Sequence, residues 1–377
     1  MKVLYIGHYK EGTGWGHAAI DYILAMDAAG IDVVCRSINF NDKPAEIPRR
    51  IQELEEKSLK GCDVCIQHIL PHYMDYNGNF KKNIALYATE TDSFERTNWP
   101  ERINFMDEAW VINEQMVEAS KRSGVNIPIK VVPHACDTSK FNKTYSKFEI
   151  PQLQDTFIFY FIGELIRRKN LVALIKAFHI EFDTNEPVSL VVKANKSGMD
   201  EDECFNHIKE ICVQVKTNLK LYPTPDDYKK EVIIAQRLSE EDMCRLHVTG
   251  DCFVAPSFGE AWCIPAFDAM GFGSTPICTD TGGMKDFLKE GGGTLVKAYP
   301  EPAFGMTETF QDLYTGYEDW HNIDIRELQK AMRRMYNLSL ENSPEYLSIK
   351  KTGLENVDKY SYKAVGETIK KALEDAN

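Results

Sequence analysis

The chain has 377 residues, which exceeds the roughly 250–300 residues at which one hydrophobic core stops growing, so we expect two domains. Its formal net charge of −13 disfavours a nucleic-acid partner and any general attraction to anionic lipid, although peripheral membrane contact stays open. The only apolar run at the start, Val3 to Ile6, is too short for a signal peptide or a membrane-spanning helix, so we expect a cytoplasmic protein with reduced cysteines.

The N-terminal part reads as short apolar strands that alternate with helical segments. A glycine-rich turn is expected at 12–16 and a helix at 18–29. Strands are expected at 3–6, 31–37, 64–66, 84–87, 109–112 and 129–132. Because the strands are apolar throughout, we predict a mostly parallel sheet with helices on both faces.

A polar, linker-like stretch around 145–155 separates this series from a second one. Strands are expected there at 157–162, 190–193, 231–235, 252–255, 276–278 and 293–296, with helices at 170–182, 201–215 and 239–247 and a helical tail from 323. The predicted fold class is therefore α/β, with two Rossmann-like doubly wound domains that face each other across a cleft. We place the domains at 1–147 and 148–359, and expect the C-terminal helix, about 360–377, to pack back on the first.

Ligands of such sheets bind beyond the carboxyl ends of the strands, so motifs that follow strands matter most. Gly12, Gly14 and Gly16 follow the first strand and can approach a phosphate, but His17 breaks the G-x-G-x-x-G spacing of dinucleotide sites. Glu90 follows a later strand and is a candidate for orienting an acceptor or meeting positive charge on a sugar. His68 and His72 are rival candidates for that role, and for each of these three side chains a supporting or surface position is the alternative.

The segment 161–170 is predicted as a strand end, a loop and a helix start. Three consecutive cations, Arg167, Arg168 and Lys169, stand at that helix start, where the helix dipole disfavours positive charge. An anionic ligand is a natural explanation, because Arg168 can fork onto phosphate oxygens and Lys169 supplies a point charge. A solvated basic turn is the alternative interpretation.

The segment 255–276 predicts a buried strand, a loop that presents Glu260, and a helix that begins near Cys263. The N-terminus of that helix suits a phosphate. Asp268 follows eight residues later, so at 1.5 Å per helical residue its carboxylate should lie roughly 10 Å away. Two such acids suit the two hydroxyl-bearing ends of one elongated ligand with a diphosphate between them. An ordinary strand–helix unit with two exposed acids is the alternative.

A third segment, 280–286, also follows a predicted strand. Its Gly282 and Gly283 permit close approach of the backbone to a ligand. We interpret them as backbone donors near a diphosphate, with a simple turn as the alternative.

Together these segments resemble the donor site of the retaining GT-B glycosyltransferases, the glycosyl transferases group 1 or family 4, with their E-x(7)-E motif. Glu260 and Asp268 match the two acids of that motif, of which the first contacts the donor sugar and the second the ribose. Lys169 matches the pyrophosphate lysine of the family. The sequence departs from the family at 261–263, which replace Gly-Phe-Gly, and at Glu164, which stands where an arginine is frequent.

The resemblance implies a GT-B fold and a set of site residues. Those expected near the chemistry are Glu260, Lys169, Arg168 and Glu90. Those expected to bind the donor are Asp268, Ala261, Trp262, Cys263, Ile264, Gly14, Trp15, Gly16, Gly163, Gly282, Gly283 and Arg237. No metal ligands are expected, and no cofactor is required besides the nucleoside-diphosphate sugar, because the cations can replace a metal.

The predicted function is retaining transfer of a sugar from a UDP- or GDP-sugar to an acceptor hydroxyl on a glycan or lipid-linked glycan. Three alternatives remain: a GT-B-shaped epimerase or phosphorylase, an inactive module that binds a nucleotide sugar, and, with least support, a nicotinamide oxidoreductase. The sequence does not identify the base, the sugar or the acceptor.

Overall fold

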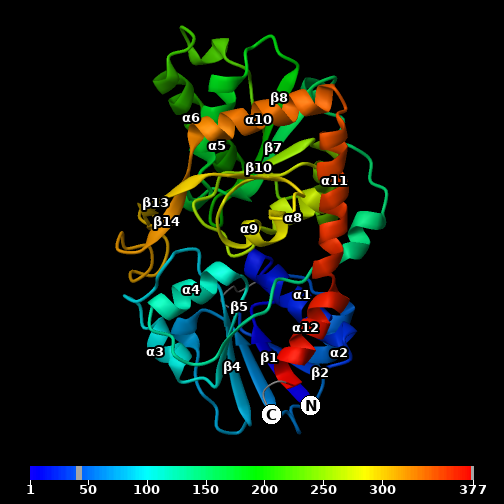
Figure 1. Cartoon of the computed structure of the whole chain (residues 1–377), viewed down its shortest axis with the longest axis vertical. Helices are drawn as coiled ribbons and strands as arrows, with labels where there is room; N and C mark the ends of the chain where they lie inside the picture. Colours follow the sequence, from blue (N-terminus) through cyan, green and yellow to red (C-terminus); the bar gives the residue numbers. More distant parts are fainter. Residues whose placement is uncertain (40–44, 375–377) are drawn as a thin grey trace. The chain divides into compact units, whose positions relative to one another are not determined.

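A computed structural model describes residues 1–39 and 45–374 of the chain (Figure 1). The chain divides into two compact units. Unit 1 contains Met1–Thr138, Phe310–Glu318 and the residues from Val357 onward, and unit 2 contains Ser139–Thr309 and Asp319–Asn356. One short segment, 310–318, therefore belongs to unit 1 although the chain on both sides of it belongs to unit 2.

Unit 1 is built on a six-stranded parallel sheet with the order β2-β1-β3-β4-β5-β6. Its strands are β1 (Lys2–Gly7), β2 (Asp32–Ser37), β3 (Val64–His68), β4 (Lys82–Tyr87), β5 (Glu108–Val111) and β6 (Ile129–Val131). The order reverses at β1, so the carboxyl ends of β1 and β3 form the switch point at which such sheets bind ligands.

Within residues 1–39 and 45–374, the helices that accompany this sheet are α1 (Gly14–Ala28), α2 (Arg49–Glu55), α3 (Trp99–Asn104), α4 (Glu114–Arg122) and α12 (Tyr362–Glu374). Helix α12 comes from the far end of the chain and packs along α1, as Figure 1 shows. Val365 and Ile369 of α12 join Tyr5 and Ile23 in one buried apolar cluster, so the last helix contributes to the core of unit 1.

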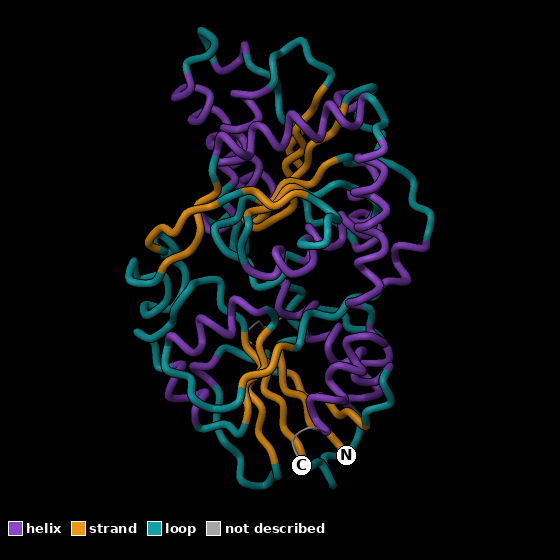
Figure 2. Tube along the Cα trace, in the orientation of Figure 1, coloured by secondary structure: helices purple, strands orange, loops and turns teal. Residues whose placement is uncertain are grey.

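Unit 2 repeats the architecture with the strand order β12-β11-β10-β7-β8-β9, again parallel (Figure 2). Its strands are β7 (Phe157–Glu164), β8 (Val188–Asn195), β9 (Val232–Ile234), β10 (Cys252–Ala255), β11 (Ile277–Thr279) and β12 (Thr294–Val296). Its helices include α5 (Leu171–Glu181), α6 (Glu201–Leu219), α7 (Glu240–Thr249), α8 (Ile264–Gly271), α9 (Gly282–Leu288), α10 (Ile325–Leu340) and α11 (Pro344–Val357).

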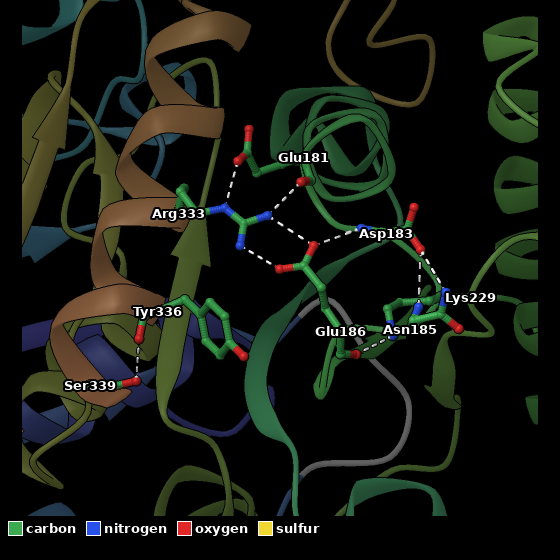
Figure 3. A network of polar contacts seen from close by, with 8 residues as sticks. All are labelled: Glu181, Asp183, Asn185, Glu186, Lys229, Arg333, Tyr336 and Ser339. Carbon is green, nitrogen blue, oxygen red and sulfur yellow. Dashed lines mark hydrogen bonds and ion pairs between the residues drawn. The ribbon is translucent and has the colours of Figure 1, made fainter. Parts of the chain in front are cut away.

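Helix α10 packs against α5 and is fixed there by a polar network around Arg333 (Figure 3). The Arg333 guanidinium lies 2.8 Å from a carboxylate oxygen of Glu181 and donates both to the Glu181 carbonyl, at 2.7 Å, and to the Glu186 carboxylate. It also lies over the ring of Phe182, 4.4 Å from the centroid. This single side chain thus joins α10 to the connection between α5 and β8.

Three features differ from the sequence prediction. The expected glycine turn at 12–16 is already helical from Gly14, because the side chain of Thr13 accepts a hydrogen bond from the Gly16 N–H and caps the helix. Gly282 and Gly283 likewise form the first turn of α9 and not a loop. An antiparallel hairpin, β13 (Ala298–Pro302) with β14 (Asp319–Ile323), was not predicted.

Candidate functional site

Two loops of unit 2 meet at the carboxyl edge of its sheet, where β7 and β10 are neighbours. The loop after β7 ends in a short 3-10 turn, Arg167–Lys169, and the loop after β10 leads to α8. The Phe258 N–H donates to the Arg168 carbonyl at 2.9 Å, and the Asn170 side chain donates to the Pro256 carbonyl at 3.1 Å. These bonds hold the two predicted motifs side by side.

The contact between the loops brings together Arg168, Lys169 and Glu260. The Lys169 ammonium lies 2.6 Å from one carboxylate oxygen of Glu260, and an Arg168 guanidinium nitrogen lies 3.1 Å from the other. That same Arg168 nitrogen donates to the Gly259 carbonyl at 2.7 Å. The three charged groups that the sequence pattern selected therefore form one cluster, which we call the charge triad.

The charge triad is largely withdrawn from solvent. The side chain of Glu260 is 6% exposed, that of Arg168 12% and that of Lys169 17%. Burial acts to raise the pKa of Glu260, but the charges of Lys169 and Arg168 outweigh it and hold that pKa at about 2. Glu260 is thus a carboxylate at all physiological pH values, and it can accept hydrogen bonds but cannot act as a general acid.

The charge triad carries two positive charges against one negative charge. An anion that enters this edge of the sheet meets both cations, while a ligand hydroxyl can donate to Glu260. A ligand with phosphate groups at one end and hydroxyl groups at the other fits this arrangement of charges.

The residues after Glu260 lead into helix α8. Cys263 caps the helix in a left-handed conformation, with φ of 71°, and Ile264 is its first residue. Trp262 is buried against Phe267 and Phe287, whereas Ala261 and Ile264 are half-buried. The ring of Trp262 thereby anchors the loop that carries Glu260.

The start of helix α9 lies directly against this loop. The Gly283 N–H donates to the Glu260 carbonyl at 3.2 Å. A side chain at Gly282, whose φ is +57°, would place its Cβ 1.9 Å from that same oxygen. Both glycines thus allow α9 to support the backbone of Glu260, and the Gly283 donor is directed at the protein itself.

Three further residues of unit 2 were predicted to bind the donor, and each lies on a different element. Asp268, in the second turn of α8, forms an ion pair of 2.6 Å with Lys140, a residue that the sequence analysis did not select. Gly163 is half-buried near the end of β7. Arg237 is exposed after β9, near the buried side chain of Lys193, whose pKa is lowered by burial and by the charge of Arg237.

In unit 1, Gly14, Trp15 and Gly16 form the first turn of α1, beyond the end of β1. Gly14 is exposed and Gly16 is buried. The half-buried ring of Trp15 lies 5.2 Å from that of His68, measured between centroids. These residues therefore stand at the switch point of the unit 1 sheet.

Glu90 lies in the loop after β4, His68 is the last residue of β3, and His72 lies in the turn after β3. All three therefore lie at the carboxyl edge of the unit 1 sheet. His68 is buried, contacts the Tyr5 hydroxyl at 2.5 Å, and has its pKa lowered to about 3 by burial and by His8 and His134. A neutral, enclosed imidazole of this kind supports the sheet. Glu90 accepts a hydrogen bond of 2.8 Å from Tyr314, which was also not selected from the sequence.

Of the two residues that the sequence analysis missed, only Tyr314 carries a weak sequence signal. Tyr314 lies in the segment 303–318, which has no periodic pattern but carries three other aromatic residues, Phe304, Phe310 and Tyr317. Aromatic side chains in an irregular segment are a reason to examine it for a binding role. Lys140 carries no such signal.

Within residues 1–39 and 45–374, no group of three or more His, Cys, Asp or Glu side chains is arranged to hold a metal ion. No helix in the same part of the chain is both long enough and apolar enough to cross a membrane. All ten cysteines are free thiols.

Solved structures with the same architecture cover the whole chain. Sucrose-phosphate synthase from Thermosynechococcus elongatus matches with a TM-score of 0.65 and 15% identity over 100% of this chain and 98% of that chain. The Escherichia coli structure described as trehalose-6-phosphate bound with UDP-2-fluoro glucose gives 0.69 and 12% over 99% of both chains. Anabaena HepE in complex with UDP gives 0.67 and 14% over 100% of both chains. The fold is therefore GT-B, as predicted.

Sequence comparison then matches part of the chain to a family. Residues 142–305, which include the whole charge triad, match the family described as Glycosyl transferases group 1. No curated protein sequence matches the chain. The segment that carries the charge triad therefore matches this family, and the predicted enzyme class, a glycosyltransferase, is confirmed.

Proposed function

We propose that this enzyme is a retaining glycosyltransferase that moves a sugar from a UDP-sugar to an acceptor hydroxyl. The observation that carries the proposal is the charge triad, in which Arg168 and Lys169 converge on the ionised carboxylate of Glu260. The choice of uridine is supported by similar structures that hold UDP, UDP-glucose or UDP-2-fluoro glucose.

The diphosphate of the donor would take the place that Glu260 now holds beside the two cations. Arg168 is suited to fork onto two phosphate oxygens, and Lys169 adds a mobile point charge. At the start of α8 the N–H of Ile264 would provide a further donor for the phosphates, because Pro265 has no N–H and those of Ala266 and Phe267 donate to the Cys263 carbonyl. Glu260, released from part of its ion pairing, would accept hydrogen bonds from hydroxyls of the sugar ring.

Further contacts of the donor are proposed along the same unit. Asp268 would accept hydrogen bonds from ribose hydroxyls while it also forms its ion pair with Lys140. Arg237, which is exposed after β9, would meet the base.

In the reaction, the bond between the anomeric carbon and the diphosphate oxygen breaks, and a bond from the acceptor oxygen forms on the same face of the sugar. The acceptor proton passes to the departing phosphate oxygen, so UDP and the glycosylated product result. Negative charge grows on the diphosphate in the transition state, and fixed cations that stabilise such charge are usually the largest contribution to catalysis. The proposed role of the triad cations is this stabilisation.

The acceptor is proposed to be a glycan or lipid-linked glycan. Glu90, at the carboxyl edge of the unit 1 sheet, is the acidic residue that we propose to hydrogen-bond an acceptor hydroxyl. Its hydrogen bond with Tyr314 fixes the orientation of the carboxylate.

Replacing Lys169 with Ala tests the proposal. We expect kcat for UDP-sugar turnover to fall by about 10²–10³-fold or more, because one fixed charge is lost from the leaving group. Release of UDP from a panel of UDP-sugars, with water or saccharides as acceptors, measures this rate.

The matched control is Lys330→Ala on α10, whose ammonium also pairs with a glutamate, Glu327, at 2.8 Å but is exposed to solvent. The control should keep the wild-type rate. Near-normal turnover in Lys169→Ala, with an unchanged melting temperature, would remove the diphosphate role of the triad.

A further inference from the structure

The hairpin β13–β14 lies between β12 and α10 in the chain, and Figure 1 labels both of its strands. In the described part of the chain it forms a two-stranded sheet of its own and does not pair with the six-stranded sheet of unit 2. Its position therefore depends on individual contacts. These contacts join the hairpin to the connections that carry the charge triad.

The first contact reaches Phe258, which lies in the loop after β10, two residues before Glu260. Its ring stacks on that of Trp320 in β14, with the centroids 4.5 Å apart and an angle of 14° between the ring planes. The N–H of His321 donates to the Phe258 carbonyl at 2.8 Å. Because the Phe258 N–H donates to the Arg168 carbonyl, this one residue connects the hairpin to the turn that carries the triad cations.

The second contact reaches helix α9. Nδ1 of His321 lies 3.2 Å from the hydroxyl oxygen of Thr281, the residue that precedes α9. The first turn of α9 supports Glu260, because the Gly283 N–H donates to the Glu260 carbonyl. The hairpin therefore reaches Glu260 by two routes, through Phe258 and through α9.

The third contact involves Arg167, the first of the three consecutive cations. Its guanidinium lies over the ring of Phe304, which follows β13, 4.1 Å from the centroid, and 3.9 Å from the carboxylate of Glu301. Gly305, whose φ is +82°, passes so close that a Cβ there would lie 2.7 Å from Cδ of Arg167. Arg167 thus packs on the end of the hairpin, whereas the next two cations belong to the charge triad.

These contacts matter because the position of Glu260 is not fixed by a strand or a helix. Glu260 lies in the irregular connection between β10 and α8, and such segments are more mobile than regular elements unless contacts hold them. A displacement of about 1 Å of a group that meets the substrate can cost about 10²-fold in rate. Loss of the hairpin contacts is therefore expected to shift Glu260 relative to Arg168 and Lys169.

We propose that the β13–β14 hairpin positions the charge triad for the donor, with Trp320 as the positioning residue that acts through Phe258. The inference rests on the proposed function, in which Glu260 meets the donor sugar, and adds to it a residue outside the predicted motifs. Trp320 has no exposed surface, so it holds the loop and does not touch the donor. Arg167 holds the other end of the hairpin and is not a ligand of the diphosphate.

The test compares three variants of the full-length protein. Trp320→Leu removes the ring stack, and Trp320→Phe keeps an aromatic face against Phe258. Tyr336→Leu on α10 is the matched control, because this ring is also buried and packs on another phenyl ring, that of Phe157, with the centroids 5.7 Å apart. For each protein we would measure kcat and KM with a UDP-sugar that the wild type turns over, UDP affinity by calorimetry, and the melting temperature.

We expect kcat of Trp320→Leu to fall by on the order of 10²-fold, and Trp320→Phe to recover most of the loss. UDP affinity should fall less than kcat, because UDP lacks the sugar that Glu260 meets. Tyr336→Leu should keep the wild-type kcat although its melting temperature falls. Wild-type kcat in Trp320→Leu, or an equal loss of kcat in Tyr336→Leu, overturns the inference and leaves the proposed function intact.

A second variant keeps the test decisive if Trp320→Leu does not fold. Phe304 is 48% exposed, so Phe304→Leu leaves the core unchanged, and it removes only the aromatic face under Arg167. We expect kcat to fall by about two- to five-fold, whereas Phe205→Leu on α6, at a position that is 41% exposed, should keep the wild-type value. Equal kcat in these two variants overturns the inference. Failure of the wild type to bind UDP would instead overturn the proposed function, and this inference with it.

Discussion

At the scale of single residues, the decisive feature is a buried carboxylate between two cations. Isolated, a side chain as enclosed as Glu260 would be driven toward its neutral form. Lys169 and Arg168 reverse this, so the carboxylate remains charged. Under the proposed function, the charges that would meet a donor are therefore already present in the site before it binds.

Replacement of Glu260 with Gln tests this electrostatic balance. Because the folded pKa of Glu260, about 2, lies below its usual value of 4.5, the ionised carboxylate stabilises the fold above about pH 4.5, and this contribution disappears as the pH falls toward 2. We expect the variant to be less stable than the wild type by on the order of 3 kcal/mol at pH 7, and the difference to shrink as the pH is lowered. Urea unfolding at pH 7, 5 and 3.5 measures it, and a difference that grows on acidification would contradict the assignment.

At the scale of elements, the short loops that follow two neighbouring parallel strands, β7 and β10, place the site, while helix packing supports them. Helix α5 begins directly after the turn that carries Arg168 and Lys169, and α10 fixes the other end of α5 through Arg333 (Figure 3). The hydrogen bonds from Arg333 to Glu186 and Glu181 raise the pKa of the guanidinium, and Arg333 in turn lowers the pKa of Glu186. The support thus lies at the end of α5 away from the charge triad.

Replacing Arg333 with Met keeps much of the apolar length of the side chain but leaves two carboxylates without their cation. We expect a loss of about 2 kcal/mol in the free energy of unfolding, between the values for exposed and fully buried pairs, because the side chain is 29% exposed. Chemical denaturation measures this loss. Lys330→Met, one turn earlier on the same helix and 72% exposed, should change stability by less than about 0.5 kcal/mol.

At the scale of the whole molecule, unit 1 is formed by three separate segments of the chain. After α11 the chain returns to unit 1, where the backbone of Cys136 pairs with that of Ser361. The Tyr362 hydroxyl then donates to Asp21 at 2.6 Å, and Lys130 donates to the Ala372 carbonyl at 2.7 Å. The fold of unit 1 therefore depends on residues more than two hundred positions away from its strands.

The packing of α12 on α1 depends on Gly366, because a Cβ at this position would lie 2.2 Å from the Ala25 carbonyl oxygen. We expect Gly366→Val to force the helices apart and to cost about 2–3 kcal/mol in stability. Lys370→Val, an exposed position on the same helix, controls for helix propensity and should cost under about 1 kcal/mol. Thermal unfolding measures both, and UDP affinity should remain unchanged because the charge triad lies in unit 2; equal melting temperatures for the two variants would refute the expectation.

The local pattern of the sequence determined the two parallel α/β sheets and the ends of most strands. Short apolar runs bounded by turn residues predict buried strands. Glycine, proline and the consecutive cations of 167–169 indicate the loops between strands and helices. For the same reason Arg168, Lys169 and Glu260 were found, since each stands in the connection that follows a strand and the carboxyl ends of neighbouring strands meet at one edge.

Only the tertiary structure decided which distant residues meet. The ion pair of Asp268 with Lys140, the Tyr314–Glu90 hydrogen bond and the contact of Gly366 with Ala25 each join segments more than a hundred residues apart. The helical start at Gly14 and at Gly282 also escaped prediction, because glycine has a low helix propensity and the cap or the neighbouring loop overrides it. Local periodicity predicts the strand or helix to which a residue belongs. Which distant residues contact one another depends instead on how the completed strands and helices pack.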